Sequence, residues 1–398
     1  MGIFPTNKLK IMKSKIAIAS AFLTLTSASM GEIVINEFLS FEGFVDMAYT
    51  HFDGEAGDFN ESDNSFGIEE VEVSFLFDFN PVTALIDFEY EENGEDLEVE
   101  QAFITYTFDE GKLKNSSIDA GRYASMLGFE AYERVGRYQF STAYESAVLG
   151  SALNSGVFNG NLSSDSFAYF ESVLIPVGER YSQGVRYVYE DEKMLLAASL
   201  QDGTLNYENR LGGNDGPTDT AVDDGGYGFE LAFAYDCGSG MTYFLGGSYE
   251  MGDGLNDGAF STGDTETFII NTYATYETGA WLFAAEINYG DTDMDDITTL
   301  GDGSIESLTG LIMTNYAYNA QASVTGRISY IDLSADFSDN SDNEADAFKF
   351  TVAHNYAFTD NLLLVGELSY LGGEFDSDLD SGDDWEELSA AVQLLFTF

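Results

Sequence analysis

The sequence predicts an all-β protein: a transmembrane antiparallel β-barrel of about 16 strands, within a range of roughly 14 to 18. First, runs of about ten residues with alternating apolar and polar character repeat along most of the chain. Second, 15% of the 398 residues are aromatic, yet no stretch beyond the N-terminus approaches the roughly 18 apolar residues of a membrane-spanning helix. Third, the chain ends in an alternating run whose last residue is Phe398. The length suits one large barrel.

The final run, Glu386 to Phe398, divides into an apolar and a polar face. In a barrel that crosses lipid, the last strand closes the sheet so that no edge is left unpaired. The run resembles the C-terminal insertion signal of bacterial outer-membrane proteins, so we expect assembly machinery to recognise Phe396 and Phe398. The alternative is the last strand of a soluble sandwich. The predicted lipid face consists of Leu388, Ala390, Val392, Leu394, Phe396 and Phe398.

The N-terminus has the pattern of a secretory signal peptide. Four lysines precede the apolar run Ile16 to Leu25, and the small residues Ser27, Ala28 and Ser29 follow it. A buried or anchoring helix is disfavoured because the run is short and polar residues interrupt it. We therefore expect a signal peptide over residues 1–31 and a barrel over 32–398, exported to the outer membrane of a Gram-negative bacterium.

The charge of the chain excludes nucleic acid as a partner. Without the signal peptide, 11 basic groups oppose 70 acidic groups, a formal charge of −59, and no basic stripe is present. Such acidity suits long loops that bind divalent cations, and it favours cations near any pore mouth. We expect no cofactor apart from Ca²⁺ or Mg²⁺ at these external loops. The single Cys237 allows no internal disulfide.

Sixteen alternating runs can be counted from Leu39 onward. They are Leu39–Thr50, Ser65–Phe79, Val82–Glu92, Asp96–Phe108, Ser117–Tyr123, Arg180–Glu190, Met194–Gln201, Tyr227–Cys237, Met241–Glu250, Thr267–Glu277, Trp281–Gly290, Leu308–Tyr318, Ala320–Leu333, Ala347–Phe358, Leu362–Leu371 and Glu386–Phe398.

The connections between these runs alternate in length, which predicts the orientation of the barrel. Short periplasmic turns and long external loops are typical of such proteins. The predicted long loops are rich in Asp, Gly, Ser and Asn, so we expect an acidic outer surface. They are Asn206–Gly225, Met251–Glu266, Asp291–Ser307, Ser334–Asp346 and Gly372–Trp385.

Alternation within the runs predicts a polar interior. In one run Trp281, Phe283 and Ile287 would face lipid, while Glu286 and Asn288 would face the lumen. Buried Glu, Lys and Asn without partners would destabilise a sealed core, so a water-filled channel is the better interpretation.

One segment, Met126 to Pro176, departs from the hairpin rhythm. Segments of this length in a barrel often fold inward and narrow the channel. Arginines cluster in and after it, and the parity of Arg180 and Arg186 directs both into the lumen. We interpret the group as a constriction that selects solutes, with the alternative that the arginines only offset nearby acids. Its candidate residues are Arg134, Arg137, Arg180, Arg186, Glu130 and Glu133.

The same region resembles a known family, the OmpL-like β-barrel porins. The motifs that carry the resemblance are Gly121-Arg122-Tyr123, Gly128 to Glu133, Ser141, Ile175-Pro176 and Gln183 to Tyr187. The Asn that follows the Gly-x-Glu segment in the family is missing, and Thr142 stands where the family has Arg after Ser. The resemblance implies an outer-membrane pore for small solutes and names no substrate.

A weak calcium pattern lies near the C-terminus. Asp376, Asp378, Asp380 and the later Glu387 approach the spacing of a calcium loop, but Gly382 comes one residue late and helices are missing. Acidic loops also produce such spacing by chance.

The sequence does not predict an enzyme. Only His51 and His354 follow the signal peptide, and neither has the setting of a serine hydrolase. An aspartic pair among 70 acids is the one catalytic arrangement that the sequence leaves open.

The sequence therefore predicts a porin that passes small hydrophilic solutes or ions by diffusion through the outer membrane. The alternatives are a non-conducting structural or adhesive barrel with acidic, cation-binding external loops, and a secreted soluble β-rich binding protein. Porins of this width often form homotrimers, but no residue pattern here marks an interface.

Overall fold

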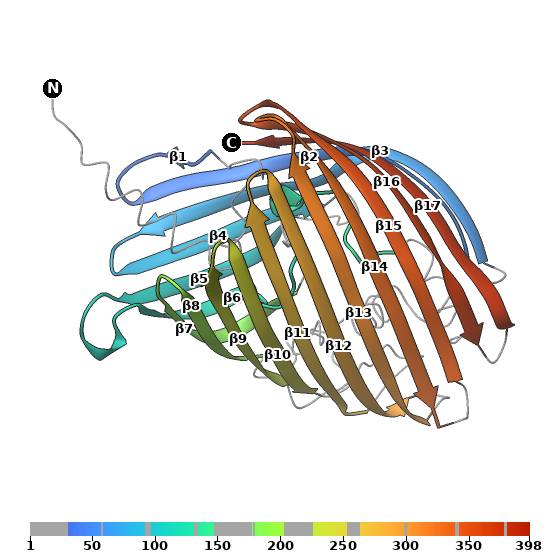
Figure 1. Ribbon diagram of the computed structural model, residues 1–398. Coiled ribbons are helices and arrows are strands. Elements are labelled where there is room, and N and C mark those ends of the chain that lie inside the picture. Colours follow the sequence, from blue (N-terminus) through green and yellow to red (C-terminus); the bar gives the residue numbers. More distant parts are fainter. Residues whose placement is uncertain are drawn as a thin grey trace.

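A closed antiparallel barrel is formed by strands β2 to β17 (Figure 1). Each strand pairs with the next along the chain, and β17 pairs with β2. This computed structural model describes residues 31–56, 59–91, 97–130, 134–146, 177, 180–202, 226–252, 263–297, 301–338, 342–377 and 380–398. Within these ranges, no helix is long and apolar enough to cross a membrane.

The sixteen predicted runs all correspond to barrel strands, so this part of the prediction is confirmed. The strands are β1 (Ile33–Val34), β2 (Leu39–Ala56), β3 (Phe59–Asp78), β4 (Val82–Glu91), β5 (Glu98–Phe108), β6 (Ser116–Ala124), β7 (Tyr181–Glu190), β8 (Met194–Gln201), β9 (Tyr227–Gly238), β10 (Met241–Gly252), β11 (Thr265–Thr278), β12 (Trp281–Ile297), β13 (Gly301–Ala317), β14 (Ala322–Phe337), β15 (Asp342–Thr359), β16 (Leu362–Ser377) and β17 (Asp380–Thr397).

The short strand β1 completes the closing seam. Residues of β17 pair with β2 as far as Thr397 opposite Phe44, and β1 then pairs with the first residues of β2. Along this edge of β2, the pairing partners thus come from both ends of the described chain: β17 at the C-terminus and β1 near the N-terminus. Phe398 continues this pairing through backbone hydrogen bonds with Gly43 of 2.9 and 3.0 Å.

Side chains alternate between the outer and inner faces as predicted. On β12 the outward residues run from Trp281 to Tyr289, while Glu286 and Asn288 are buried on the inner face. Nine tilted residues span about 20 Å of membrane, close to the apolar band of about 25 Å in such barrels. The outer face of β12 is therefore suited to lipid along this stretch.

Beyond Tyr289 the outer face of β12 changes from apolar to acidic. Asp291, Asp293 and Asp295 continue the outward register, and Tyr289 lies at the boundary. Tyr330 marks the same transition on β14, where its hydroxyl donates to Asp332 over 2.8 Å. These tyrosines form the upper aromatic belt of the barrel.

The prediction of three of the long loops is largely wrong. These loops were expected over Asp291–Ser307, Ser334–Asp346 and Gly372–Trp385. Most of their residues continue the strands, leaving connections of residues 298–300, 338–341 and 378–379. Beyond the membrane the outer face is wet, so the ladder continues without the apolar alternation that marks a strand in sequence.

The barrel wall is uneven in height (Figure 1). We call β12–β17 together with β2 and β3 the tall wall; its strands have 16 to 20 residues. The short wall, β4–β8, has strands of 8 to 11 residues. At the step between them, β3 pairs with β4 only from Glu70 to Asp78. The part of β3 above Glu70 has no described partner on that side.

Candidate channel interior

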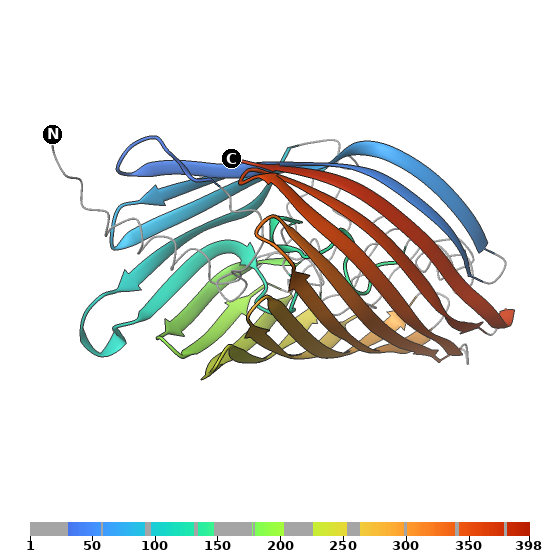
Figure 2. The same cartoon turned by 45° about the horizontal axis from the view of Figure 1, so that its top comes forward.

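A segment that follows β6 lies inside the ring of strands (Figure 2, teal). We call its described residues, 125–130 and 134–146, the inner segment. It hydrogen-bonds to inward side chains of β9, β11, β12 and β14 to β17, and its Arg134 reaches β2 and β3. The remainder of the predicted stretch, residues 131–133 and 147–176, lies outside the described residues.

Four glutamates of the barrel wall accept hydrogen bonds from this segment. Glu230 accepts from the Met126 backbone N–H at 2.6 Å, and Glu286 accepts from that of Phe129 at 2.7 Å. Glu367 accepts from the Phe140 backbone N–H at 2.7 Å. Glu387 accepts from the Ser146 hydroxyl at 3.0 Å. Because a carboxylate can accept several hydrogen bonds, each satisfies backbone or hydroxyl donors that would otherwise be buried unpaired.

Two cations bind the carbonyl groups of the same segment. Arg327 on β14, whose side chain is fully buried, donates to the carbonyl oxygens of Ser141 at 2.9 Å and Thr142 at 2.8 Å, and it pairs with Glu130. Lys349 on β15 donates to the Glu145 carbonyl oxygen at 2.7 Å. The tall wall therefore fixes the inner segment through both its donors and its acceptors.

Apolar contacts reinforce this attachment. Phe129, Tyr138, Ala143 and Tyr144 belong to one buried cluster with inward residues of the tall wall. Burial and the nearby Glu286 carboxylate raise the pKa of Tyr144, so its hydroxyl stays protonated and donates to Glu286 at 3.0 Å. The predicted polar interior is interrupted here by an apolar surface, against which the inner segment packs. Wall residues of this cluster include Ile305, Met313, Ile331, Leu333, Phe337 and Trp385.

Arg134, a predicted constriction residue, is the link from the inner segment to β2 and β3. Its Nε lies 3.0 Å from Glu70 Oε2 and 3.4 Å from Asp46 Oδ2. Burial lowers the pKa of Arg134, but the two carboxylates outweigh that effect and raise it. The guanidinium is thus held as a cation against two acids.

Among the other predicted arginines, Arg137 shares acidic neighbours with Arg134, whereas Arg186 is paired elsewhere. Arg186 points inward as predicted, but it pairs with Asp119 of the neighbouring strand at 3.0 Å and lies over the Tyr123 ring at 4.3 Å. Arg180 is buried beside the start of the inner segment, where its carbonyl oxygen accepts from the Ser125 N–H at 2.8 Å. Arg137 follows the short 3-10 turn Arg134–Gly136. The arginines are thus distributed between wall and inner segment.

The predicted acidic partners have separate places. Glu130 accepts from Arg327 and from the Ala143 backbone N–H at 2.7 Å. Glu133 lies outside the described residues. A constriction role for Glu130 and these arginines stays a prediction.

Two of the predicted calcium residues, Asp376 and Glu387, lie apart in the structure. Asp376 is exposed near the end of β16, whereas Glu387 is buried on the inner face, where it contacts Ser146 and Ser389. Glu387 pairs in register with Leu371, five residues from Asp376 along β16, a separation of about 17 Å along the strand. Asp378 and the Asp380 side chain lie outside what the structure describes. Strand pairing, which the spacing argument did not consider, separates Asp376 from Glu387.

The C-terminal residues occupy the predicted faces. Phe396 is exposed on the outer face, and the Phe398 ring lies 6.0 Å from that of Phe396 and 6.3 Å from that of Phe41. Recognition of this strand by assembly machinery stays a prediction.

Sequence reasoning missed several inner residues. Arg327, Glu230 and Glu367 lie on the inward parity of their strands, and this parity is the signal that could have identified them. It could not have shown that they bind the inner segment. Glu72, Asp87 and Glu100 were missed as well; their oxygen atoms lie within 4.8 Å of one another.

Comparison with known proteins agrees with this architecture. The family described as "Putative beta-barrel porin-2, OmpL-like" matches residues 161–398. That range contains the motifs Ile175-Pro176 and Gln183 to Tyr187, but not the earlier ones. No curated protein matches the chain.

Solved outer-membrane barrels share the fold at low sequence identity. OmpT of Vibrio cholerae is 14% identical, with 92% of this chain and 100% of that chain covered and a TM-score of 0.56. An anion-selective porin from Comamonas acidovorans is 13% identical, with 90% and 99% covered and a TM-score of 0.56. The channel DcaP of Acinetobacter baumannii is 12% identical, with 90% and 97% covered and a TM-score of 0.53. With more than half of its length matched by the family, and with this barrel, the chain belongs to the OmpL-like β-barrel porin-2 family of outer-membrane proteins.

Proposed function

We propose that this protein is a diffusion channel for small hydrophilic solutes or ions. The observation that carries the proposal is the combination of an apolar outer face with an inner wall lined by buried polar residues such as Asn271, Asn288 and Thr325. Passage requires no chemical step, so we expect no enzymatic activity. The family and the fold support a pore but do not identify its solute.

The inner segment is the element that we propose to narrow the channel. It is bound along the tall wall, and its Arg134, Arg137 and Glu130 are the predicted constriction residues that we retain. Arg134 and Glu130 are both paired with opposite charges, which weakens the field that either can exert on a passing ion. Selectivity should therefore follow the excess of inner acids and favour cations.

A non-conducting barrel is the second candidate, and one observation favours it. The inner segment packs against the wall through an apolar cluster, as a plug would. In that case the acids beyond the membrane, such as Asp291, Asp293 and Asp295, would serve adhesion or binding of divalent cations such as Ca²⁺ or Mg²⁺. A homotrimer is a further proposal, supported by the trimer form recorded for Vibrio cholerae OmpT.

Single-channel recording of the refolded protein in a planar bilayer tests these proposals. Stepwise conductance with a reversal potential showing cation preference would support the channel. Stable insertion without conductance steps would exclude the channel and favour the plugged barrel. Native mass measurement in mild detergent would test the trimer on the same preparation.

A further inference from the structure

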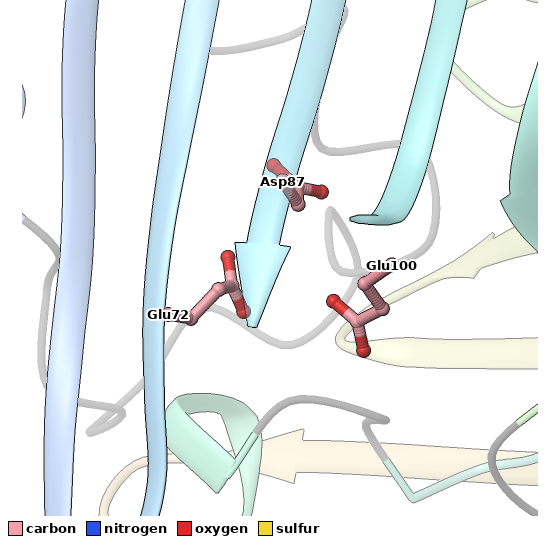
Figure 3. A group of neighbouring side chains, drawn as sticks. All are labelled: Glu72, Asp87 and Glu100. Carbon is pink, nitrogen blue, oxygen red and sulfur yellow. The ribbon is translucent and has the colours of Figure 1, made fainter. Parts of the chain in front are cut away.

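Three acidic side chains meet on the inner face at the step between the two walls: Glu72 on β3, Asp87 on β4 and Glu100 on β5 (Figure 3). One carboxylate oxygen from each lies within 4.8 Å of the others. All three side chains are buried, with exposed fractions of 2%, 2% and 4%. We call this group the step cluster.

A β-bulge creates the step cluster. Ile86 pairs with Ala102 and Phe88 pairs with Val99, so Asp87 alone lies opposite both Glu100 and Gln101. Such a bulge changes the direction of a side chain relative to regular alternation. Gln101 donates to Asp87 Oδ2 at 2.9 Å, and Glu100 joins the carboxylate group. Three neighbouring strands thereby contribute one acid each.

Within the described part of the chain, two members of the step cluster, Glu72 and Asp87, lack the counter-charge that several other inner acids have. Arg134 pairs with Asp46 and Glu70, Arg186 pairs with Asp119, and Arg327 pairs with Glu130. Among the described residues, no Lys or Arg lies within salt-bridge distance of Glu72 or Asp87. Burying carboxylates together without a counter-charge is strongly unfavourable.

Oxygen atoms without a protein partner also point to a ligand. Glu72 Oε1 accepts from Ser74 Oγ at 2.5 Å and Asp87 Oδ2 accepts from Gln101, but Glu72 Oε2 and Asp87 Oδ1 are buried and have no hydrogen-bond partner. In Figure 3 the Glu72 and Glu100 carboxylates lie on either side of the end of β4, with Asp87 above them. Each of the first two acids thus has one oxygen satisfied by protein and one available.

We propose that the step cluster binds a divalent cation, with calcium preferred. Ligands made only of carboxylate oxygens suit hard cations. Ca²⁺ accepts irregular coordination by carboxylate oxygens, whereas Mg²⁺ demands near-octahedral geometry and usually keeps several water ligands. The three side chains are only 2–4% exposed, which leaves little room for such water and favours calcium. The ion would brace the three strands where the wall drops in height.

Calcium titration of the refolded, chelator-treated protein tests this proposal, by calorimetry and by thermal unfolding with and without Ca²⁺. Asp87→Asn and Glu72→Gln each remove one ligand charge; Asp376→Asn makes the same change at an exposed acid outside the step cluster. We expect one stoichiometric site in the wild type and in Asp376→Asn, and affinity reduced more than about tenfold in either cluster variant. Calcium should raise the Tm of the wild type but not that of Asp87→Asn.

A contrasting result would overturn the proposal. Without calcium, Asp87→Asn should unfold at a higher temperature than the wild type, because one buried charge is gone. If that rise appears but the wild type binds no stoichiometric calcium, the carboxylates share protons and there is no metal site. If Asp376→Asn loses as much calcium binding as the step-cluster variants, the ion belongs to the outer acids. Tighter binding of Mg²⁺ than of Ca²⁺ would refute the preference for calcium. If Asp87→Asn does not fold, Glu72→Gln provides the same comparison. The assay does not depend on conductance, so its failure leaves the proposed channel untouched.

Discussion

The tall wall and the short wall use their inner faces differently. The tall wall binds the inner segment through Glu286, Glu367, Arg327 and Lys349, together with an apolar cluster. The short wall bonds mainly within itself, as in the Arg186–Asp119 pair between β7 and β6. The tall wall thus supplies most of the polar support for the inner segment, whereas the short wall adds apolar contacts around Leu127.

The largest expected effect comes from Arg327→Ala. The change leaves Glu130 without its cation and removes two donors to the inner segment, which should destabilise the protein by about 3–5 kcal/mol and raise single-channel conductance. Urea unfolding and bilayer recording measure the two effects.

Arg186→Ala is the matched control on the short wall. It also breaks a buried ion pair, but one that joins two wall strands, so stability should fall without a change in conductance. Similar conductance changes in both variants would abolish the distinction between the walls.

A smaller effect tests where the membrane ends on the tall wall. Ile287→Arg places a charge on the lipid face of β12 and should destabilise the barrel by about 2–4 kcal/mol. Asp293→Arg lies on the same face of the same strand, beyond Tyr289, and should change stability by less than about 1 kcal/mol. Urea midpoints of refolded protein in lipid vesicles report both, and equal losses would place the boundary elsewhere.

A pH effect is expected at the loop end of β8. Burial raises the pKa of Asp202 to about 6, although the Gln183 backbone N–H opposes the shift. The folded protein therefore holds this proton more tightly than the unfolded chain, where the pKa is 3.8. The stabilisation of the folded state that this tighter proton binding provides is complete below about pH 4, and it disappears as pH rises through about 6.

Asp202→Asn tests this effect, since an amide cannot titrate. From pH 4 to pH 7, the unfolding free energy of the wild type should fall relative to that of the variant. Parallel stability profiles over that range would show that Asp202 has an ordinary pKa.

The smallest effect is expected at the aromatic belt. Tyr330→Phe removes a hydrogen bond to Asp332 near water, so the loss should not exceed about 1 kcal/mol. On the short wall, Tyr123→Phe removes a buried hydroxyl bonded to Ser199 at 2.8 Å, and its loss should reach about 1–3 kcal/mol. Chemical unfolding of the two variants in parallel makes this comparison, and the reverse order would contradict it.

The sequence predicted the strands better than their partners. Alternation identified all sixteen runs and placed Glu286 and Asn288 on the inner face, because a period of two is imposed by strand geometry itself. It failed for Asp291 to Ile297, where strand pairing continues although the outer residues become acidic. It also missed the Asp87 bulge and the bonds from Glu367 to Ser141, since both depend on contacts between distant parts of the chain. The same limit applied to the arginines, whose direction was predictable but whose pairing was not.

The step in the wall also bears on solubility during assembly. Residues 59–68 of β3 pair with β2 on one side, and among the described residues no strand pairs with them on the other. An open strand edge of this kind is a template for pairing with another chain and hence for aggregation. Glu61, Asp63 and Glu69 lie along this edge, and repulsion between like charges would oppose docking of a second copy. The acidity that first suggested cation binding thus also serves as protection against misassembly.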